Sequence, residues 1–170
     1  MLVTTITVLG VDGAQATNNR EMMAKAFMEW CSAPIPSWDA MNAKATAEKL
    51  QVVQRREKPL AKSGFIEDKM WSVNDKRGSY AIDAAHYNRK GKQTASCSVY
   101  FDDLMDDDFP AYLGKQLKLG KPHNVTRLGD GKQITVWDTA PDVRIMLTTG
   151  GIGGLKGAAI NRMQTLEPDR

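Results

Sequence analysis

Histidine side chains are where acid–base chemistry would most naturally arise in this sequence, because an ordinary imidazole changes charge between about pH 5 and 8. The 170 residues contain two of them, His86 and His123. Hydrolysis by a serine nucleophile needs an imidazole beside both a carboxylate and a hydroxyl, for which Asp83 and Ser96 are candidates. The Gly-x-Ser-x-Gly turn that presents such a serine in many hydrolases is missing from the sequence. A small envelope hydrolase that uses His86 or His123 as general base is therefore the alternative function.

A glycine-rich stretch at residues 150–154, followed by Lys156, has the composition of a phosphate-binding loop. A Walker motif needs Ser or Thr directly after the lysine, and Gly157 stands there instead. A dinucleotide-binding loop needs a following helix and an acidic residue about 20 positions later, for which too little chain remains. Gly151, Gly153 and Lys156 are retained as candidate ligand residues in a loop whose composition favours a hairpin turn.

The sequence gives little support for a metal site. Tetrahedral zinc needs four ligands, and only two histidines and two cysteines are present. The acidic residues that precede a predicted helix are Asp102, Asp103, Asp106, Asp107 and Asp108. They lack the alternating spacing and distal Glu of an EF-hand loop, and the helix dipole favours acidic residues there in any case. We predict a solvated acidic segment, with no metal and no cofactor.

The two cysteines are predicted to form a disulfide. Cys31 ends a helical apolar pattern, and Cys97 lies in a strand where Ala95, Cys97 and Val99 alternate with polar residues, so both side chains should face the core. Closing the long loop between them would stabilise the fold by roughly 4 kcal/mol in the chain-entropy model. The alternative is a pair of buried free thiols.

The N-terminal residues predict export. Residues 2–11 form an uncharged and largely apolar run, and Ala14-Gln15-Ala16 is a small-x-small tripeptide of the kind that ends a secretory signal. We expect residues 1–16 to be a signal peptide, truncated at its start because no Lys or Arg precedes the run, and residues 17–170 to be a single periplasmic or secreted domain. The alternative is a first strand at residues 3–8, with Asp12-Gly13 as its turn. No other stretch has the 18 or so apolar residues of a membrane-spanning helix.

The charge distribution argues against nucleic acid as a partner. Basic and acidic residues number 23 and 20, giving a net charge of +3, and they are interspersed along the chain. Arg89, Lys90 and Lys92 lie near Tyr87 and Tyr100, a combination that binds single strands in some proteins. They fall at a predicted hairpin tip, where solvation alone accounts for them.

The periodicity of the sequence predicts an α+β fold with two N-terminal helices and one inserted helix packed on a meandering antiparallel sheet. The first helix is expected to begin at Asn18, where Glu21 completes a capping box, and to end before the prolines at 34 and 36. The second is expected from Trp38 to about Gln54, and the third over residues 108–119. Strands are expected from Met70 onward, at 80–87, 95–101, 123–128, 132–138 and 143–149, and at 155–164 in preference to a helix. Trp71 and Trp137 are expected to anchor the core.

Taken together, these features predict an exported binding or accessory protein rather than an enzyme. It would act through an unidentified protein partner or small ligand, as a monomer or weak homodimer. The hydrolase is the alternative, and an anion or nucleotide binder that uses the loop at residues 150–154 is a third hypothesis.

Overall fold

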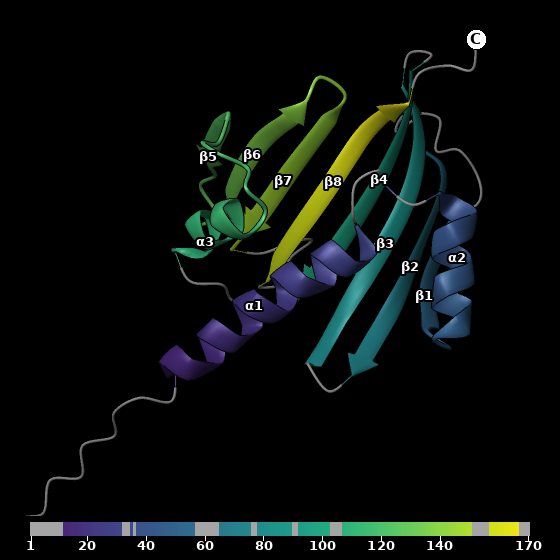
Figure 1. Cartoon of the computed structure of the whole chain (residues 1–170), viewed down its shortest axis with the longest axis horizontal. Coiled ribbons are helices and arrows are strands. Elements are labelled where there is room, and N and C mark those ends of the chain that lie inside the picture. The colour runs from purple at the N-terminus through teal and green to yellow at the C-terminus, as the bar shows by residue number, and fades with distance from the viewer. Residues whose placement is uncertain are drawn as a thin grey trace, which may run out of the picture.

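One antiparallel sheet organises the chain. The computed structural model describes residues 12–31, 35, 37–56, 65–75, 78–89, 92–102, 107–150 and 157–166. Within them the elements follow in the order α1 (Asp12–Trp30), α2 (Trp38–Ala47), β1 (Gln51–Arg56), β2 (Phe65–Asp75), β3 (Gly78–Arg89), β4 (Lys92–Phe101), α3 (Phe109–Gln116), β5 (Asn124–Arg127), β6 (Gln133–Ala140), β7 (Val143–Thr149) and β8 (Ala158–Leu166) (Figure 1). The predicted α+β fold is confirmed.

The sheet consists of two four-stranded meanders joined side by side. Its strand order is β1-β2-β3-β4-β8-β7-β6-β5, and every neighbouring pair is antiparallel. The last strand, β8, therefore lies near the centre, between β4 and β7, which confirms that this segment is a strand rather than a helix. Each meander follows a helix: α2 precedes β1–β4, and α3 precedes β5–β8.

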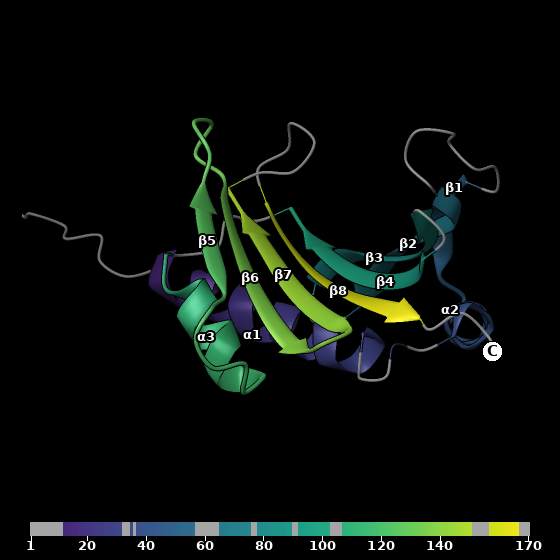
Figure 2. The same ribbon diagram turned by 90° about the horizontal axis from the view of Figure 1, so that it is seen from above.

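The helices lie on one side of a curved sheet, as Figure 2 shows. Alternate residues of the central strands face them, because successive side chains in a strand point to opposite faces. Ile82, Val99 and Ile160 are neighbours across β3, β4 and β8, and each is fully buried. From α1, Phe27 and Trp30 join the same core. Trp71 and Trp137 are buried in it as well, which confirms their predicted role.

The helix boundaries differ from the predicted ones. Asn18 lies inside α1, which begins at Asp12, so the predicted capping box does not start this helix. The second helix ends at Ala47 rather than near Gln54, and Lys49 then adopts a left-handed φ of 56°. The chain turns there into β1, where the β-branched Val52 lies opposite Trp71 of β2. Pairing with β2 thus overrides the helical propensity of the local sequence.

Two N-terminal features can be placed only in part. Residues 1–11, which hold most of the predicted signal peptide and the alternative strand, lie outside the described residues, and residues 12–16 form the start of α1. Among the helices that the structure describes, none combines the length and the hydropathy needed to cross a membrane.

The disulfide between Cys31 and Cys97 is confirmed. Cys31 directly follows α1, and Cys97 lies in the middle of β4 with Ala84 and Arg162 as its neighbours on β3 and β8. The two Cα atoms are 5.4 Å apart, and both residues are fully buried. The bond therefore fixes the C-terminal end of α1 to the centre of the sheet.

Removing this bond should weaken the fold measurably. We expect the double substitution Cys31→Ala with Cys97→Ala to lower the free energy of unfolding by about 2–5 kcal/mol, because the unfolded chain regains the conformations that the crosslink excludes. Urea unfolding followed by tryptophan fluorescence measures this difference. The unreduced wild-type protein, labelled under denaturing conditions, should show no reactive thiol, and labelling at both cysteines would contradict the assignment.

Candidate functional site

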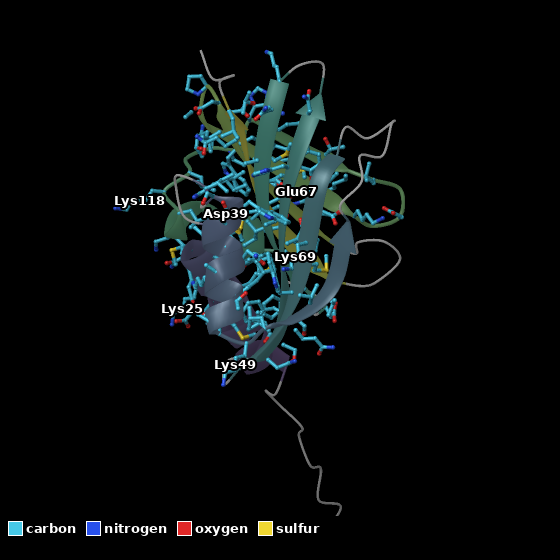
Figure 3. The ribbon with its side chains drawn as sticks, turned by 90° about the vertical axis from the view of Figure 1, so that its right-hand side faces the viewer. Lys25, Asp39, Lys49, Glu67, Lys69 and Lys118 are labelled. Carbon is cyan, nitrogen blue, oxygen red and sulfur yellow. A yellow bond between two sulfur atoms is a disulfide. The ribbon has the colours of Figure 1, made fainter. Side chains whose placement is uncertain are left out.

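His86 pairs with a carboxylate on the helix side of the sheet. It lies opposite Glu67 of β2, and its Nδ1 is 3.4 Å from Glu67 Oε1. The Trp38 ring of α2 approaches it, with ring centroids 6.0 Å apart. Figure 3 shows Glu67 and Lys69 along β2, beside α2, and the Lys69 ammonium donates a hydrogen bond to Asn42 Oδ1 of that helix. His86 thus belongs to a half-exposed polar edge where α2 meets the sheet.

His123 lies in the other half of the molecule, just before β5. Its Nδ1 is 3.4 Å from Asp138 Oδ2 of β6, and the other oxygen of that carboxylate accepts a hydrogen bond of 2.8 Å from Arg144 Nε. The hydrogen bond from Arg144 lowers the pKa of Asp138, and the charges of Arg144 and His123 add to this effect. The imidazole itself is about two-thirds exposed. The fold does not bring the two histidines together, and no hydroxyl in the described chain hydrogen-bonds to either.

The remaining predicted candidates give no site. Gly151, Gly153 and Lys156 lie outside the described residues. Of the acidic segment, Asp102, Asp107 and Asp108 are described and are exposed, as predicted. Within the described chain, no cluster of three or more His, Cys, Asp or Glu side chains is arranged to hold a metal ion.

The sheet face opposite the helices carries an unexpected set of buried polar side chains. Five polar residues of the described chain are buried, and four of them lie on this face. We call this set, together with two neighbouring residues, the polar face: Asp68, Asp83, Ser96, Ser98, Tyr100 and Asn161. The exposed fractions of Asp68 and Asp83 are 4% and 8%, and those of Ser96 and Ser98 are 2% and 1%. Figure 2 shows no labelled helix over this side of the sheet.

Strand register brings these residues together from four strands. Asp83, Ser98 and Asn161 are direct neighbours on β3, β4 and β8. Asp68 of β2 faces Ala85, one step along the sheet from Asp83. Asn161 Nδ2 donates a hydrogen bond of 2.6 Å to Ser98 Oγ, whereas Asn161 Oδ1 is buried and accepts none from the described residues. The result is a band of polar side chains that crosses four adjacent strands, β2, β3, β4 and β8.

Small residues and methionines surround this polar centre. Ala81, Ala85 and Ala159 are its cross-strand neighbours, and Ala85 and Ala159 are themselves buried. The half-buried Met70 and Met146 flank it on β2 and β7. A hollow of about 190 Å³ adjoins the face, lined in part by Thr94, Met163 and Arg144. Met163, which lies opposite Ser96, connects this hollow to the polar face, although none of the six polar-face residues lines it.

The ionisation of Tyr100 reflects the negative potential of the polar face. Burial, followed by the neighbouring charge of Asp83, raises the pKa of Tyr100 to about 12, and a hydrogen bond with Ser98 opposes part of this rise. Tyr100 therefore keeps its proton at neutral pH and adds no charge to the two aspartates. The face combines carboxylate, amide and hydroxyl groups, which suits recognition of a ligand rich in hydrogen-bond donors.

Part of this site can be predicted from the sequence. The alternation of Ser96, Ser98 and Tyr100 with apolar residues predicts one polar side for β4. Aspartate is unfavourable in strands, so Asp68 and Asp83 within β2 and β3 are a further indication of a special environment. Which strands lie side by side, however, depends on contacts distant in sequence.

Comparison of the chain with known protein families, with curated proteins and with solved structures found no match.

Tyr100 should produce a distinct alkaline transition. Its pKa is about 12 in the folded protein, against 10.0 for an ordinary tyrosine, so the stability that its neutral form contributes is present below pH 10.0 and is lost as the pH rises through about 12. We expect Tyr100→Phe to make the fall in stability between these pH values shallower. Urea unfolding at a series of pH values measures it, and tyrosinate absorbance reports the missing ionisation. Identical pH profiles for the two proteins would contradict the assignment.

Proposed function

We propose that the protein is an exported binding protein, whose polar face holds a small ligand that carries a positive charge and several hydrogen-bond donors. The observation that carries this proposal is the pair of buried carboxylates, Asp68 and Asp83, on the sheet face opposite the helices. Both already interact with other groups of the chain. Their two negative charges on one face favour a cation over an anion as ligand.

The neighbouring groups support the same ligand class. Both aspartates already interact within the chain, so a ligand would extend an existing network rather than create one. Asn161 Oδ1 offers a further buried acceptor, and Tyr100 keeps its proton. An ammonium group on the ligand would form charge-assisted hydrogen bonds with the carboxylates, which are roughly twice as strong as neutral ones.

The contacts of the two serines that could act as nucleophiles favour a binding function over hydrolysis. Ser98 accepts a hydrogen bond from Asn161, and Ser96 donates one to the hydroxyl of Tyr87, so neither serine contacts an imidazole in the described residues. Within the described residues, His86 and His123 each lie beside a carboxylate but hydrogen-bond to no hydroxyl, so neither is placed to activate a side-chain nucleophile.

Export is part of the proposal and has two supports. The buried disulfide between Cys31 and Cys97 is typical of proteins that fold in an oxidising compartment, the periplasm or the cell exterior. The apolar N-terminal run with Ala14-Gln15-Ala16 is typical of a signal peptide. Among the residues of α1 whose burial is described, the buried ones begin at Met22, beyond the proposed cleavage after Ala16.

The ligand class can be tested with putrescine, a flexible dication, and with butanediol, which has the same length but no charge. We expect calorimetry to show saturable binding of putrescine and at least about tenfold weaker binding of butanediol, because a hydrogen bond to a charged group contributes about 1.5–3 kcal/mol. Asp83→Asn should reduce putrescine affinity by a similar factor. Asn161→Asp, which adds a third carboxylate, should increase it.

The matched control is Asp39→Asn, which removes the same charge from the exposed surface of α2 (Figure 3). It should leave putrescine affinity unchanged. An equal loss in both asparagine variants would show that net charge alone attracts the dication, and equal affinities for putrescine and butanediol would exclude a cation site. Circular dichroism of each variant verifies that it is folded.

Export has its own test, independent of the ligand. Expressed as the full chain in a bacterium, the protein should be recovered from the periplasm or medium with its N terminus at Thr17, because the predicted cleavage follows Ala16. Mass spectrometry of the purified protein determines this residue. An unprocessed chain found in the cytoplasm with free thiols would contradict export.

A further inference from the structure

A cavity of about 670 Å³ lies between α3 and the two outermost strands, β5 and β6, away from the polar face. Its walls are formed by α3 and the segment that follows it on one side and by the two strands on the other. Its volume is within the range of small-molecule sites in proteins, roughly 300–1,000 Å³.

The charged residues around this cavity are mainly basic. Lys115, Lys121 and Arg127 line it, against one acidic residue, Asp107. In the part of the chain that the structure describes, none of these three cations forms an ion pair with a carboxylate. Arg127 Nε donates a hydrogen bond of 3.1 Å to Gln133 Oε1, which holds the guanidinium group beside the opening. An anion would therefore meet three positive charges that no carboxylate of the described residues neutralises.

The rest of the wall is apolar and partly aromatic. Trp137 is 1% exposed and lies at the back of the cavity, while Val125 and Pro110 lie nearer its mouth. Val125 is about half exposed. A ligand with an apolar body would cover this valine and pack in front of the indole.

Gly114 keeps the cavity open on the α3 side. A Cβ atom at this position would lie 3.9 Å from the indole ring of Trp137, in ordinary van der Waals contact, so a larger side chain would occupy the space itself. The Trp137 indole nitrogen is buried and donates no hydrogen bond within the described residues, although buried tryptophans usually have an acceptor. A ligand oxygen that reached between Gly114 and Trp137 would supply one.

We infer that this cavity is a second binding site, specific for a small amphipathic anion. The ligand would have a flat apolar body against Trp137 and Val125, and one sulfonate, carboxylate or phosphate group toward Lys121 and Arg127. The inference does not depend on the polar face, which attracts the opposite charge.

Two related dyes provide the test. Anilinonaphthalene sulfonate is an aromatic anion, and N-phenylnaphthylamine has the same aromatic body without the sulfonate. We expect the native protein to bind one sulfonate dye per chain, and to bind the uncharged dye at least about tenfold more weakly, since the loss of a charge-assisted contact is of this size. The double substitution Lys121→Glu with Arg127→Glu should lower the affinity for the sulfonate dye by at least the same factor and leave the affinity for the uncharged dye unchanged.

Three further variants test whether the dye binds in this cavity, to surface charge in general or at the polar face. Gly114→Leu should lower the affinity for both dyes, because the leucine side chain would fill the cavity. Lys118→Glu changes an exposed lysine just after α3 that does not line the cavity, and it should have no effect (Figure 3). Asp83→Asn should also have no effect, which distinguishes failure of this site from failure of the polar face.

Several outcomes would overturn the inference. Equal affinity for the two dyes would show an apolar cavity without anion selectivity. If Lys118→Glu lowers the affinity for the sulfonate dye as much as the double substitution does, surface charge attracts the dye nonspecifically. If Gly114→Leu leaves the dye affinities unchanged, the dye binds elsewhere. Because such dyes also bind partly unfolded proteins, near-ultraviolet circular dichroism must show native packing in every variant, and dye binding that appears only when this signal is lost would also contradict the site.

Discussion

The attachment of α1 to the centre of the sheet is the constraint on which the rest of the structure depends. Eight strands expose two broad faces, and a sheet of this size is stable only if at least one face is covered by apolar packing. α1 provides that cover with Phe27 and Trp30, and the buried disulfide from Cys31 to Cys97 holds its end against β4. Since β4 pairs with β8, the helix is anchored where the two meanders join. Fixing this one contact therefore positions both halves of the fold.

Because the helices cover only one face of the sheet, the positions of the two proposed sites can also be explained. With the helices and the large apolar residues on one side, the opposite face is free to carry Asp68 and Asp83 without disturbing the core. The cavity arises from the same layout at the edge of the sheet. α3 is only eight residues long, so it buries Phe109 and Leu113 but leaves part of the space beside β5 and β6 unfilled.

Local patterns in the sequence predict much of the fold, and long-range pairing accounts for the rest. Period-two alternation and turn residues predict β3, β4, β6 and β7, and the apolar setting of each cysteine predicts the disulfide. β1 was missed because Gln51–Arg56 has no alternation and follows a helix-forming segment, so only its pairing with β2 makes it a strand. The polar face was missed for a related reason: Asp83 and Asn161 are far apart in sequence, and only the placement of β8 beside β4 brings them together.

The central claim is that helices pack one face of the sheet, while the opposite face keeps half-exposed methionines around a buried polar centre that a small ligand can approach. Methyl NMR of methionine-labelled protein with a neutral paramagnetic agent tests it directly, because the agent broadens only the methyl groups that it can approach. Met23 and Met41 are in the helix-covered core, Met70, Met146 and Met163 are on the opposite face, and Met28 is 43% exposed as an internal reference. The account predicts sharp signals for the first pair and broadening for the other four. Protection of Met70, Met146 and Met163 equal to that of Met23 would contradict it.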